Sequence, residues 1–243
     1  MKICMFCITY NRPKSLSRII ECFLRQTHPQ RELLILDDAD QYGHQTGDGW
    51  QIVSVPRRFR TMGEKRNAAI AMASGDVDGY LCVDDDDVYL PHTLAAVNDS
   101  LEQGAWSQPR QVLEFNPDKS LKRCETYNRK NPESIAYHAS WAYRRDALVR
   151  VGGYPWCMDE EYGLARNLRK NFGSSIDITG KHKPYYIYDR SANTNHFSTL
   201  GCDEKAYDIR GKEQIIKVPK IVPGWDINYA ALAIPSNINV RVW

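Results

Sequence analysis

The sequence contains no apolar stretch long enough to cross a membrane. Its longest purely apolar runs, at residues 3–8 and 68–73, fall far short of the roughly 18 residues that a spanning helix needs. The first residues also lack a charged region followed by an apolar stretch and a cleavage site, which argues against a signal peptide. We therefore expect a soluble protein of the cytoplasm with no transmembrane segment.

An excess of charge of one sign is also absent. The 32 Lys and Arg residues nearly balance the 30 Asp and Glu residues, which leaves a formal net charge of +2. With 42% hydrophobic and 26% charged residues, the composition is that of a folded globular protein rather than a disordered or fibrous one. The near-neutral balance argues against a strong nucleic-acid binder, because such proteins are usually more basic.

The seven cysteines show no spacing typical of a metal site. Cys4 and Cys7 lie inside an apolar run, where thiols pack as small hydrophobic side chains. An odd number of cysteines without a pairing pattern is most simply explained by a protein of the reducing cytosol.

A chain of 243 residues is long enough for one large domain or two small ones. Internal repeats, low-complexity segments and a linker between two domains are missing too, which favours a single domain. The first hundred residues alternate between strand and helix patterns. The expected strands span residues 3–9, 32–36, 52–55 and 79–83, and the expected helices span residues 13–26, 63–73 and 91–103. This alternation predicts an α/β fold with a mostly parallel sheet flanked by helices, whose ligands bind at the carboxyl ends of the strands.

The second half of the chain is less regular. Residues 106–150 mix strand-like pieces, at 111–115 and 140–143, with polar turns, and residues 159–172 have a helical pattern. From about residue 175 the sequence supports short strands and loops only. We therefore expect a single α/β domain with an irregular C-terminal extension.

Four consecutive aspartates at residues 84–87 follow the expected strand at 79–83. Carboxylates this close repel one another and raise one another's pKa unless a positive charge meets them. A divalent cation supplies that charge, and carboxylate oxygens suit Mg²⁺ or Mn²⁺. A solvated turn, or a cap for the following helix, is the alternative explanation.

Several further motifs stand at regular distances from this acidic run. They are Thr9, Tyr10, Asn11, Arg12 and Pro13 after the first strand, Asp37 and Asp38 after the second, and Gly63, Arg66 and Asn67 at a helix start. Together with the acidic run and Pro91, they resemble family 2 of the glycosyltransferases, enzymes with the GT-A fold that use nucleotide-sugar donors. The resemblance covers residues 3–100 closely and residues 136–172 more loosely.

The resemblance implies roles for the residues of the first half. Thr9, Tyr10, Asn11 and Arg12 match the nucleotide-binding start of the family. By the same match, Tyr10 stacks on the base and Asp38 contacts it, while Arg66 and Asn67 lie near the nucleotide and its phosphates. Asp86 corresponds to the metal ligand of the family's DXD turn. Asp84 or Asp85 then meets the ribose or a metal-bound water.

A second acidic pair follows Gly152 and Gly153, at the start of the expected helix 159–172. By resemblance, Glu161 aligns best with the catalytic base of the family. The usual pair is Glu-Asp, so this chain departs from the pattern at its second place, and Glu160 stays an alternative base. These acids also suit a structural role, because carboxylates near a helix N-terminus stabilise the helix by roughly 0.3–1 kcal/mol each.

Two late residues complete the expected site. Some family members place a histidine or arginine beside the metal or the pyrophosphate, which here points to His196 for the metal and to Arg190 for the diphosphate. A purely hydrogen-bonded His196 remains the equal alternative. We expect residues 1–175 to form the catalytic domain, with a nucleotide-binding half at 1–103 and an acceptor half at 104–175. Residues 176–243 would be an extension that completes the active site.

The expected function is therefore a hexosyltransferase reaction, in which an inverting enzyme dependent on Mn²⁺ or Mg²⁺ moves a sugar from a nucleoside diphosphate, most simply a uridine one. The acceptor expected first is a glycan or other saccharide. Modified DNA is an alternative acceptor, because basic residues such as Arg57, Arg58 and Lys122 lie among aromatic ones. A sugar-phosphate nucleotidyltransferase would need a Gly-rich loop that residues 9–13 lack, and a non-catalytic binding module would not hydrolyse donor. Oligomeric state stays open.

Overall fold

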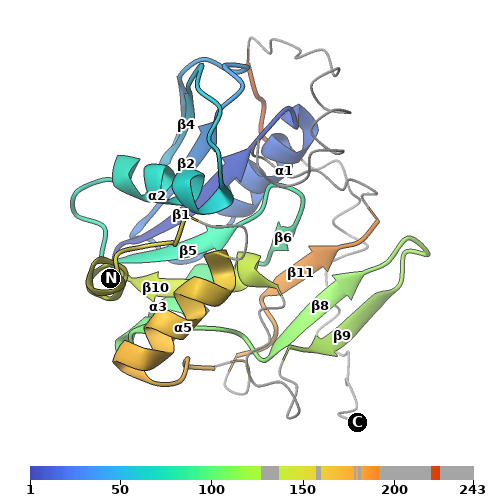
Figure 1. Ribbon diagram of the computed structural model, residues 1–243. Helices are drawn as coiled ribbons and strands as arrows, with labels where there is room; N and C mark the ends of the chain where they lie inside the picture. The colour runs from blue at the N-terminus through green and yellow to red at the C-terminus, as the bar shows by residue number, and fades with distance from the viewer. Residues whose placement is uncertain (127–136, 157–159, 178, 180–181, 192–219, 225–243) are drawn as a thin grey trace.

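The computed structural model describes residues 1–126, 137–156, 160–177, 179, 182–191 and 220–224. A sheet of seven strands runs through its centre in the order β3-β4-β2-β1-β5-β10-β7 (Figure 1). The strands are β1 (Ile3–Thr9), β2 (Arg31–Asp37), β3 (Gln45–Thr46), β4 (Trp50–Ser54), β5 (Gly79–Val83), β7 (Trp106–Ser107) and β10 (Ala142–Arg144). The four strands β4, β2, β1 and β5 are parallel, and antiparallel strands extend the sheet at both edges. The predicted mostly parallel sheet is confirmed.

Helices cover both faces of this sheet. Side chains of α1 (Pro13–Leu24) and α3 (Thr93–Gln103) share one apolar cluster with Met5 and Cys7 of β1. Side chains of α2 (Met62–Met72), α4 (Arg145–Val151) and α5 (Glu160–Phe172) share the other cluster with Cys4 and Phe6. Successive side chains of a strand point to opposite faces, so β1 is buried on both sides, as its continuous apolar sequence predicts.

A second sheet of four strands lies beside the first, in the order β6-β11-β8-β9 (Figure 1). Its strands are β6 (Val88–Tyr89), β8 (Gln111–Phe115), β9 (Leu121–Glu125) and β11 (Tyr186–Asp189). Strand β11 pairs in parallel with β8 and antiparallel with β6, although more than seventy residues of sequence separate it from β8. This pairing brings the beginning of the C-terminal part of the chain next to the acidic run, which directly precedes β6.

The α4 helix is the main element that the sequence pattern did not predict, since residues 145–151 stand in a stretch of expected strands and polar turns. The helix is short and ends at Gly152, whose φ of 78° lies in the left-handed region that favours glycine. The amide of Gly152 bonds back to the last helical turn, at the carbonyls of Leu148 and Val149. The glycine pair that follows the helix is therefore its stop signal as well as part of a motif.

No helix among these described residues is long and apolar enough to span a membrane.

Candidate active site

The polar ends of three neighbouring strands meet at one edge of the main sheet. In the register of β1 and β2, Thr9 lies opposite Asp37, and Cys7 of β1 lies opposite Val83 of β5. The residues that follow these strands, Tyr10, Asp38 and the acidic run at 84–87, therefore come together. We call this group, with Thr9, the donor edge.

Within the donor edge, Asp85 is held by the last residue of β1 and by a residue of the loop that follows. The Thr9 hydroxyl donates to Asp85 Oδ2 at 2.6 Å, and Arg12 Nη1 donates to Asp85 Oδ1 at 2.8 Å. The same guanidinium nitrogen donates to Asp86 Oδ2 at 2.7 Å. Asp85 is buried, with 2% of its surface exposed, so these bonds compensate most of the cost of burying its charge.

Three of the four aspartates offer oxygen atoms to one point in space. Ligand atoms of Asp84, Asp86 and Asp87 all lie within 4.8 Å of one another. Burial, together with the charge of Asp86, raises the pKa of Asp84 to about 7, and burial with the charge of Asp85 raises the pKa of Asp86. Oxygen ligands whose ionised forms are disfavoured by mutual repulsion fit a divalent cation, which removes that repulsion.

Asp87 differs from Asp84 and Asp86 because both of its carboxylate oxygens accept hydrogen bonds from β11. The Tyr186 hydroxyl donates to its Oδ2 at 2.5 Å, and the Asp189 amide donates to its Oδ1 at 3.0 Å. Both donors belong to β11. The Asp189 carboxylate is in turn paired with the buried guanidinium of Arg18 at 2.7 Å. Asp87 thus ties β11 to the donor edge, a role that the sequence could not assign because β11 lies about a hundred residues away.

The two predicted catalytic acids have different surroundings. Arg66 Nη1 donates to Glu160 Oε1 at 2.5 Å and to Glu161 Oε1 at 3.0 Å. The Glu160 side chain is buried, at 2% exposure, whereas that of Glu161 is 21% exposed. Burial raises the pKa of Glu160 to about 7, against the charge of Arg66 and with that of Glu161. Two glutamates that are neighbours in the sequence therefore lie in different environments, one buried and one partly exposed.

A cavity of about 370 Å³ joins the donor edge to the second sheet. Its lining residues are Arg66, Asp84, Glu114, Tyr137, His138, Ala139, Glu161, Tyr186, Tyr188 and Arg190. It therefore brings together three of the predicted site residues beyond Arg66: Asp84, Glu161 and Arg190. Glu160 does not line it.

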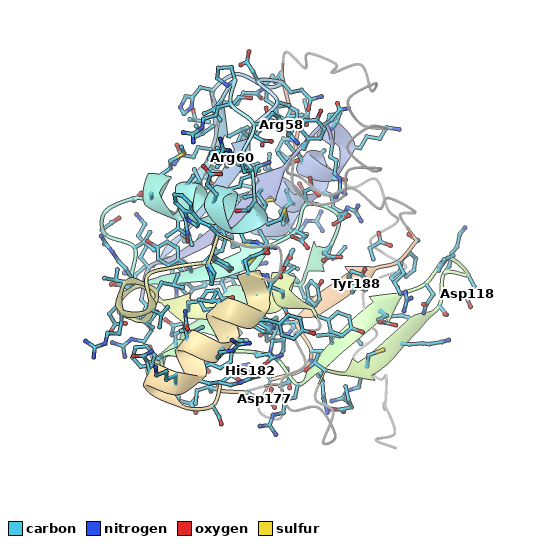
Figure 2. The ribbon with its side chains drawn as sticks, viewed as in Figure 1. Arg58, Arg60, Asp118, Asp177, His182 and Tyr188 are labelled. Atoms are coloured by element: carbon cyan, nitrogen blue, oxygen red, sulfur yellow. The ribbon has the colours of Figure 1, made fainter. Side chains whose placement is uncertain are left out.

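Four of the lining residues come from β8, from β11 or from the residue directly after β11, and we call them the second-sheet wall: Glu114, Tyr186, Tyr188 and Arg190. Arg190 Nη1 lies 3.4 Å from Glu114 Oε2, and Tyr137 donates its hydroxyl to the same carboxylate. Tyr188 is 40% exposed and projects from β11 at the border between the two sheets (Figure 2). The sequence singled out Arg190 alone in this group.

The predicted base pocket contains more cations than expected. Asp38 Oδ1 accepts from Lys65 Nζ at 2.7 Å and from Arg58 Nη1 at 2.5 Å, and the guanidinium of Arg58 lies 3.6 Å from the ring centroid of Tyr10. Lys65 is fully buried, and burial lowers its pKa although Asp38 acts in the opposite direction. The sequence analysis did not single out Lys65. Its position directly before Arg66, in the helix-opening motif, was the signal that could have pointed to it.

Three further predicted residues have other surroundings. The Asn67 side chain donates to the Tyr154 carbonyl and accepts from the Tyr154 amide, both at 2.8 Å, so it holds the loop after Gly153 against α2. Asn11 has a left-handed φ of 55° and accepts a bond from Gln41 at 2.9 Å. His196 lies outside the described residues.

Comparisons with known proteins identify the family of the chain. Residues 4–152 match the family described as Glycosyl transferase family 2. The chain is 28% identical over 177 residues to the uncharacterized glycosyltransferase alr2836 of Nostoc sp., a match that covers 68% of this chain and 50% of that protein. The chain thus spans about half the length of this relative.

Solved structures share the fold at low sequence identity. TarS 1-349 of S. aureus, solved in complex with UDP-GlcNAc, is 16% identical with a TM-score of 0.60, covering 78% of this chain and 59% of TarS. The mannosyltransferase PcManGT of Pyrobaculum calidifontis, solved with GDP-Man and Mn²⁺, is 16% identical with a TM-score of 0.53, covering 81% of this chain and 58% of that protein. These similarities and the topology above identify the fold as GT-A, and with the match over residues 4–152 the chain belongs to glycosyl transferase family 2.

Proposed function

We propose that the protein is an inverting glycosyltransferase that depends on Mn²⁺ or Mg²⁺ and transfers a sugar from a nucleoside diphosphate donor to a saccharide acceptor. The observation that carries the proposal is the shared cavity. It presents a carboxylate of the acidic run, Asp84, and a partly exposed carboxylate of α5, Glu161, to the same space. A transfer reaction needs both a site that holds the leaving diphosphate and a base that faces the acceptor.

The donor edge supplies the nucleotide subsite. Tyr10 offers an aromatic face and Asp38 a buried carboxylate at the ends of adjacent parallel strands, where ligands of open α/β sheets bind. TarS was solved with UDP-GlcNAc and shares this fold, which supports a uridine donor. Thr9 and Arg12 then act through Asp85, whose position they fix.

Asp84 and Asp86 would hold the cation, since both oxygens of Asp87 accept bonds from β11, whereas the bond that Arg12 donates to Asp86 engages one oxygen, Oδ2. A bound divalent cation supplies positive charge to the diphosphate and favours its departure. Arg66 lies at the same cavity and adds a fixed positive charge near the leaving group. His196 remains a proposal as a further ligand.

Glu161 is the proposed general base. An inverting transfer requires a carboxylate that takes the proton of the acceptor hydroxyl while that oxygen attacks the anomeric carbon opposite the leaving diphosphate. The Glu161 carboxylate lines the cavity, whereas the Glu160 carboxylate is buried against Arg66 with a pKa raised to about 7 by burial. Arg66 also orients Glu161, at 3.0 Å.

The second-sheet wall supports a saccharide as the acceptor. The cavity lining carries three carboxylates, of Asp84, Glu114 and Glu161, against two guanidinium groups. This balance disfavours a polyanion such as DNA, because its phosphates would meet carboxylates. A neutral polyhydroxylated ring suits hydrogen-bonding groups beside the exposed ring of Tyr188.

The cavity also bears on the division of the chain. Because residues of β11 and Arg190 line it, residues after 175 contribute to the proposed site. This supports the proposed division into a catalytic domain at 1–175 and an extension that completes its active site.

Titration calorimetry with uridine diphosphate tests the proposal. We expect binding in the presence of Mn²⁺ and much weaker binding with a chelator, and release of uridine diphosphate from a uridine-diphosphate sugar by the purified protein. The non-catalytic alternative predicts binding without donor turnover. Failure to bind any nucleoside diphosphate with either cation would refute the proposal.

A further inference from the structure

The side chain of Arg58 lies in the pocket that we assign to the base of the donor. Its guanidinium carbon is 3.6 Å from the ring centroid of Tyr10, and its Nη1 donates to Asp38 Oδ1 at 2.5 Å. One planar group therefore contacts at once both residues of the base pocket. In Figure 2, Arg58 is labelled beside Arg60, near the strand ends of the donor edge.

A guanidinium group and a nucleobase offer the same two features to such a pocket. Each has a flat π-face that stacks on an aromatic ring, and each presents N–H donors in its own plane. Tyr10 stacks with either group, and Asp38 accepts a hydrogen bond from either. The two cannot occupy the pocket together, because they would use the same ring face and the same carboxylate oxygen.

We propose that Arg58 is a built-in competitor of the donor base, which lowers the apparent affinity of the protein for every nucleotide that binds at Tyr10 and Asp38. This inference rests on the proposed function, since it takes the base pocket as given. Donor binding then requires Arg58 to leave the pocket.

The remaining contacts show that the pocket survives the departure of Arg58. Asp38 keeps the bond from Lys65 Nζ at 2.7 Å and the bond from the Phe59 amide at 3.1 Å. Lys65 also donates to the Thr9 carbonyl at 2.6 Å, so it is fixed in place. The buried carboxylate of Asp38 therefore keeps partners after Arg58 leaves. Losing a charged neighbour is most costly when it leaves a buried charge with no partner, and that is not the case here.

Arg58 itself is placed to move. It lies between β4 and α2, in residues 55–61, and its side chain is 23% exposed, whereas that of Lys65 is fully buried. Of the two cations on Asp38, only Arg58 therefore has a direct path to solvent. Lys65 stays bonded to Asp38 when Arg58 leaves, and Arg58 adds a second positive charge that a neutral base replaces.

A competitor within the chain reduces affinity by the fraction of molecules whose pocket is open, and this factor is the same for all ligands of the pocket. Uridine and uridine diphosphate should therefore be affected equally, although only the second carries phosphates. This equality separates a competitor for the base from a residue that binds the diphosphate.

The test is titration calorimetry of uridine and of uridine diphosphate, each with Mn²⁺, on the parent chain and on Arg58→Ala. We expect both ligands to bind roughly threefold to thirtyfold more tightly to the variant, and by the same factor. Arg57→Ala is the matched control. Arg57 stands in the same loop, is 72% exposed and pairs with Glu64 at 3.0 Å, so its variant should bind like the parent.

Unchanged or weaker binding of uridine by Arg58→Ala would overturn the inference while leaving the proposed function intact. Weaker binding of the diphosphate alone would also overturn it and would make Arg58 a phosphate ligand. If neither protein binds any nucleotide, the proposed function fails, and this inference fails with it. Equal thermal unfolding of the parent and the variant confirms that the comparison is between folded proteins.

Discussion

The two sides of the cavity are built in different ways. The donor edge comes from the ends of parallel strands near the start of the chain, and two of its buried acids are paired with cations: Asp85 with Arg12 and Asp38 with Lys65. The second-sheet wall joins β8 to β11, and its Glu114 meets Arg190 at the longer distance of 3.4 Å. The donor edge is thus a prearranged polar network, and the second-sheet wall is a more open surface assembled from distant segments.

This difference suggests a division of labour. Apart from Arg58, which has to leave the base pocket, the charged groups of the donor edge are already fixed, and a site of this kind recognises one ligand, such as a nucleotide, with little further reorganisation. A partly exposed wall with an aromatic ring and a carboxylate is suited to the second partner of the proposed reaction, the acceptor. Variants on the donor side should therefore affect binding or chemistry of the donor, and variants on the other side should affect the acceptor.

The largest effect is expected for the residue at the border of the two sides. Glu161→Gln should reduce the rate of transfer by roughly 10² to 10⁴, because the proton moves only in the transition state, while donor affinity stays near that of the parent. Rates at saturating donor, measured beside donor affinities, check this prediction. Glu160→Gln is the matched control and should change the rate little, since its carboxylate is buried away from the cavity. A severe loss in Glu160→Gln and a mild one in Glu161→Gln would exchange the two roles.

On the donor side, Asp86→Asn should weaken the Mn²⁺-dependent binding of uridine diphosphate by about tenfold or more, because it removes a charged oxygen ligand from the cation. Calorimetry with and without chelator measures the dependence. Asp118→Asn serves as the control, because Asp118 lies in the exposed turn between β8 and β9, far from the donor edge (Figure 2). Equal metal dependence in Asp86→Asn and in the parent would remove the acidic run from the donor site.

On the second-sheet wall, Tyr188→Ala should raise the KM for a saccharide acceptor by about twofold to tenfold and leave the donor affinity unchanged. Phe172→Ala is a suitable control, since Phe172 is as exposed as Tyr188, at 40%, but does not line the cavity. Initial rates at varied acceptor concentration decide the matter. A change in donor affinity instead would place Tyr188 on the donor side.

The smallest expected effect concerns stability. The pKa of Glu160 is raised by burial from the ordinary 4.5 to about 7, so the folded state holds this proton more tightly than the unfolded state does. The contribution of Glu160 to the free energy of unfolding is therefore fully present below pH 4.5 and is lost as the pH rises through about 7. Glu160→Gln should therefore flatten the free energy of unfolding between these pH values, as measured by urea titration. An unchanged slope would show that Glu160 is not the group that titrates.

Much of the donor edge could be predicted from sequence because its signals are local. A continuous apolar run gave β1 at Ile3–Thr9, and apolar spacing with Pro13 gave α1, although α1 ends at Leu24 rather than at residue 26. The register of parallel strands then places Tyr10 and Asp38 side by side without further information. The acidic run follows β5, whose bounds also agree with the prediction.

The second-sheet wall could not be predicted in the same way. Strand β6 has two residues, too few for any period, and its pairing partner β11 lies about a hundred residues further along the chain. The contacts of Asp87 with β11 depend on that pairing, and the contact of Glu114 with Arg190 depends on the pairing of β11 with β8. The contacts of Arg58 and Lys65 with Asp38 were missed for a different reason, because an ion pair between distant residues leaves no pattern in the sequence. Only the place of Lys65 beside Arg66 pointed to it, and Arg58 was named only among the basic residues for a DNA acceptor.

A crystal structure with uridine diphosphate and Mn²⁺ tests the central claim most directly, because anomalous scattering locates the cation independently of the ligand. Our account predicts Mn²⁺ on Asp84 and Asp86, the uracil ring on the face of Tyr10 that Arg58 now covers, and the diphosphate pointing into the cavity that Glu161 lines. Binding of the nucleotide away from Tyr10 and Asp38, or of the cation away from the acidic run, would contradict it.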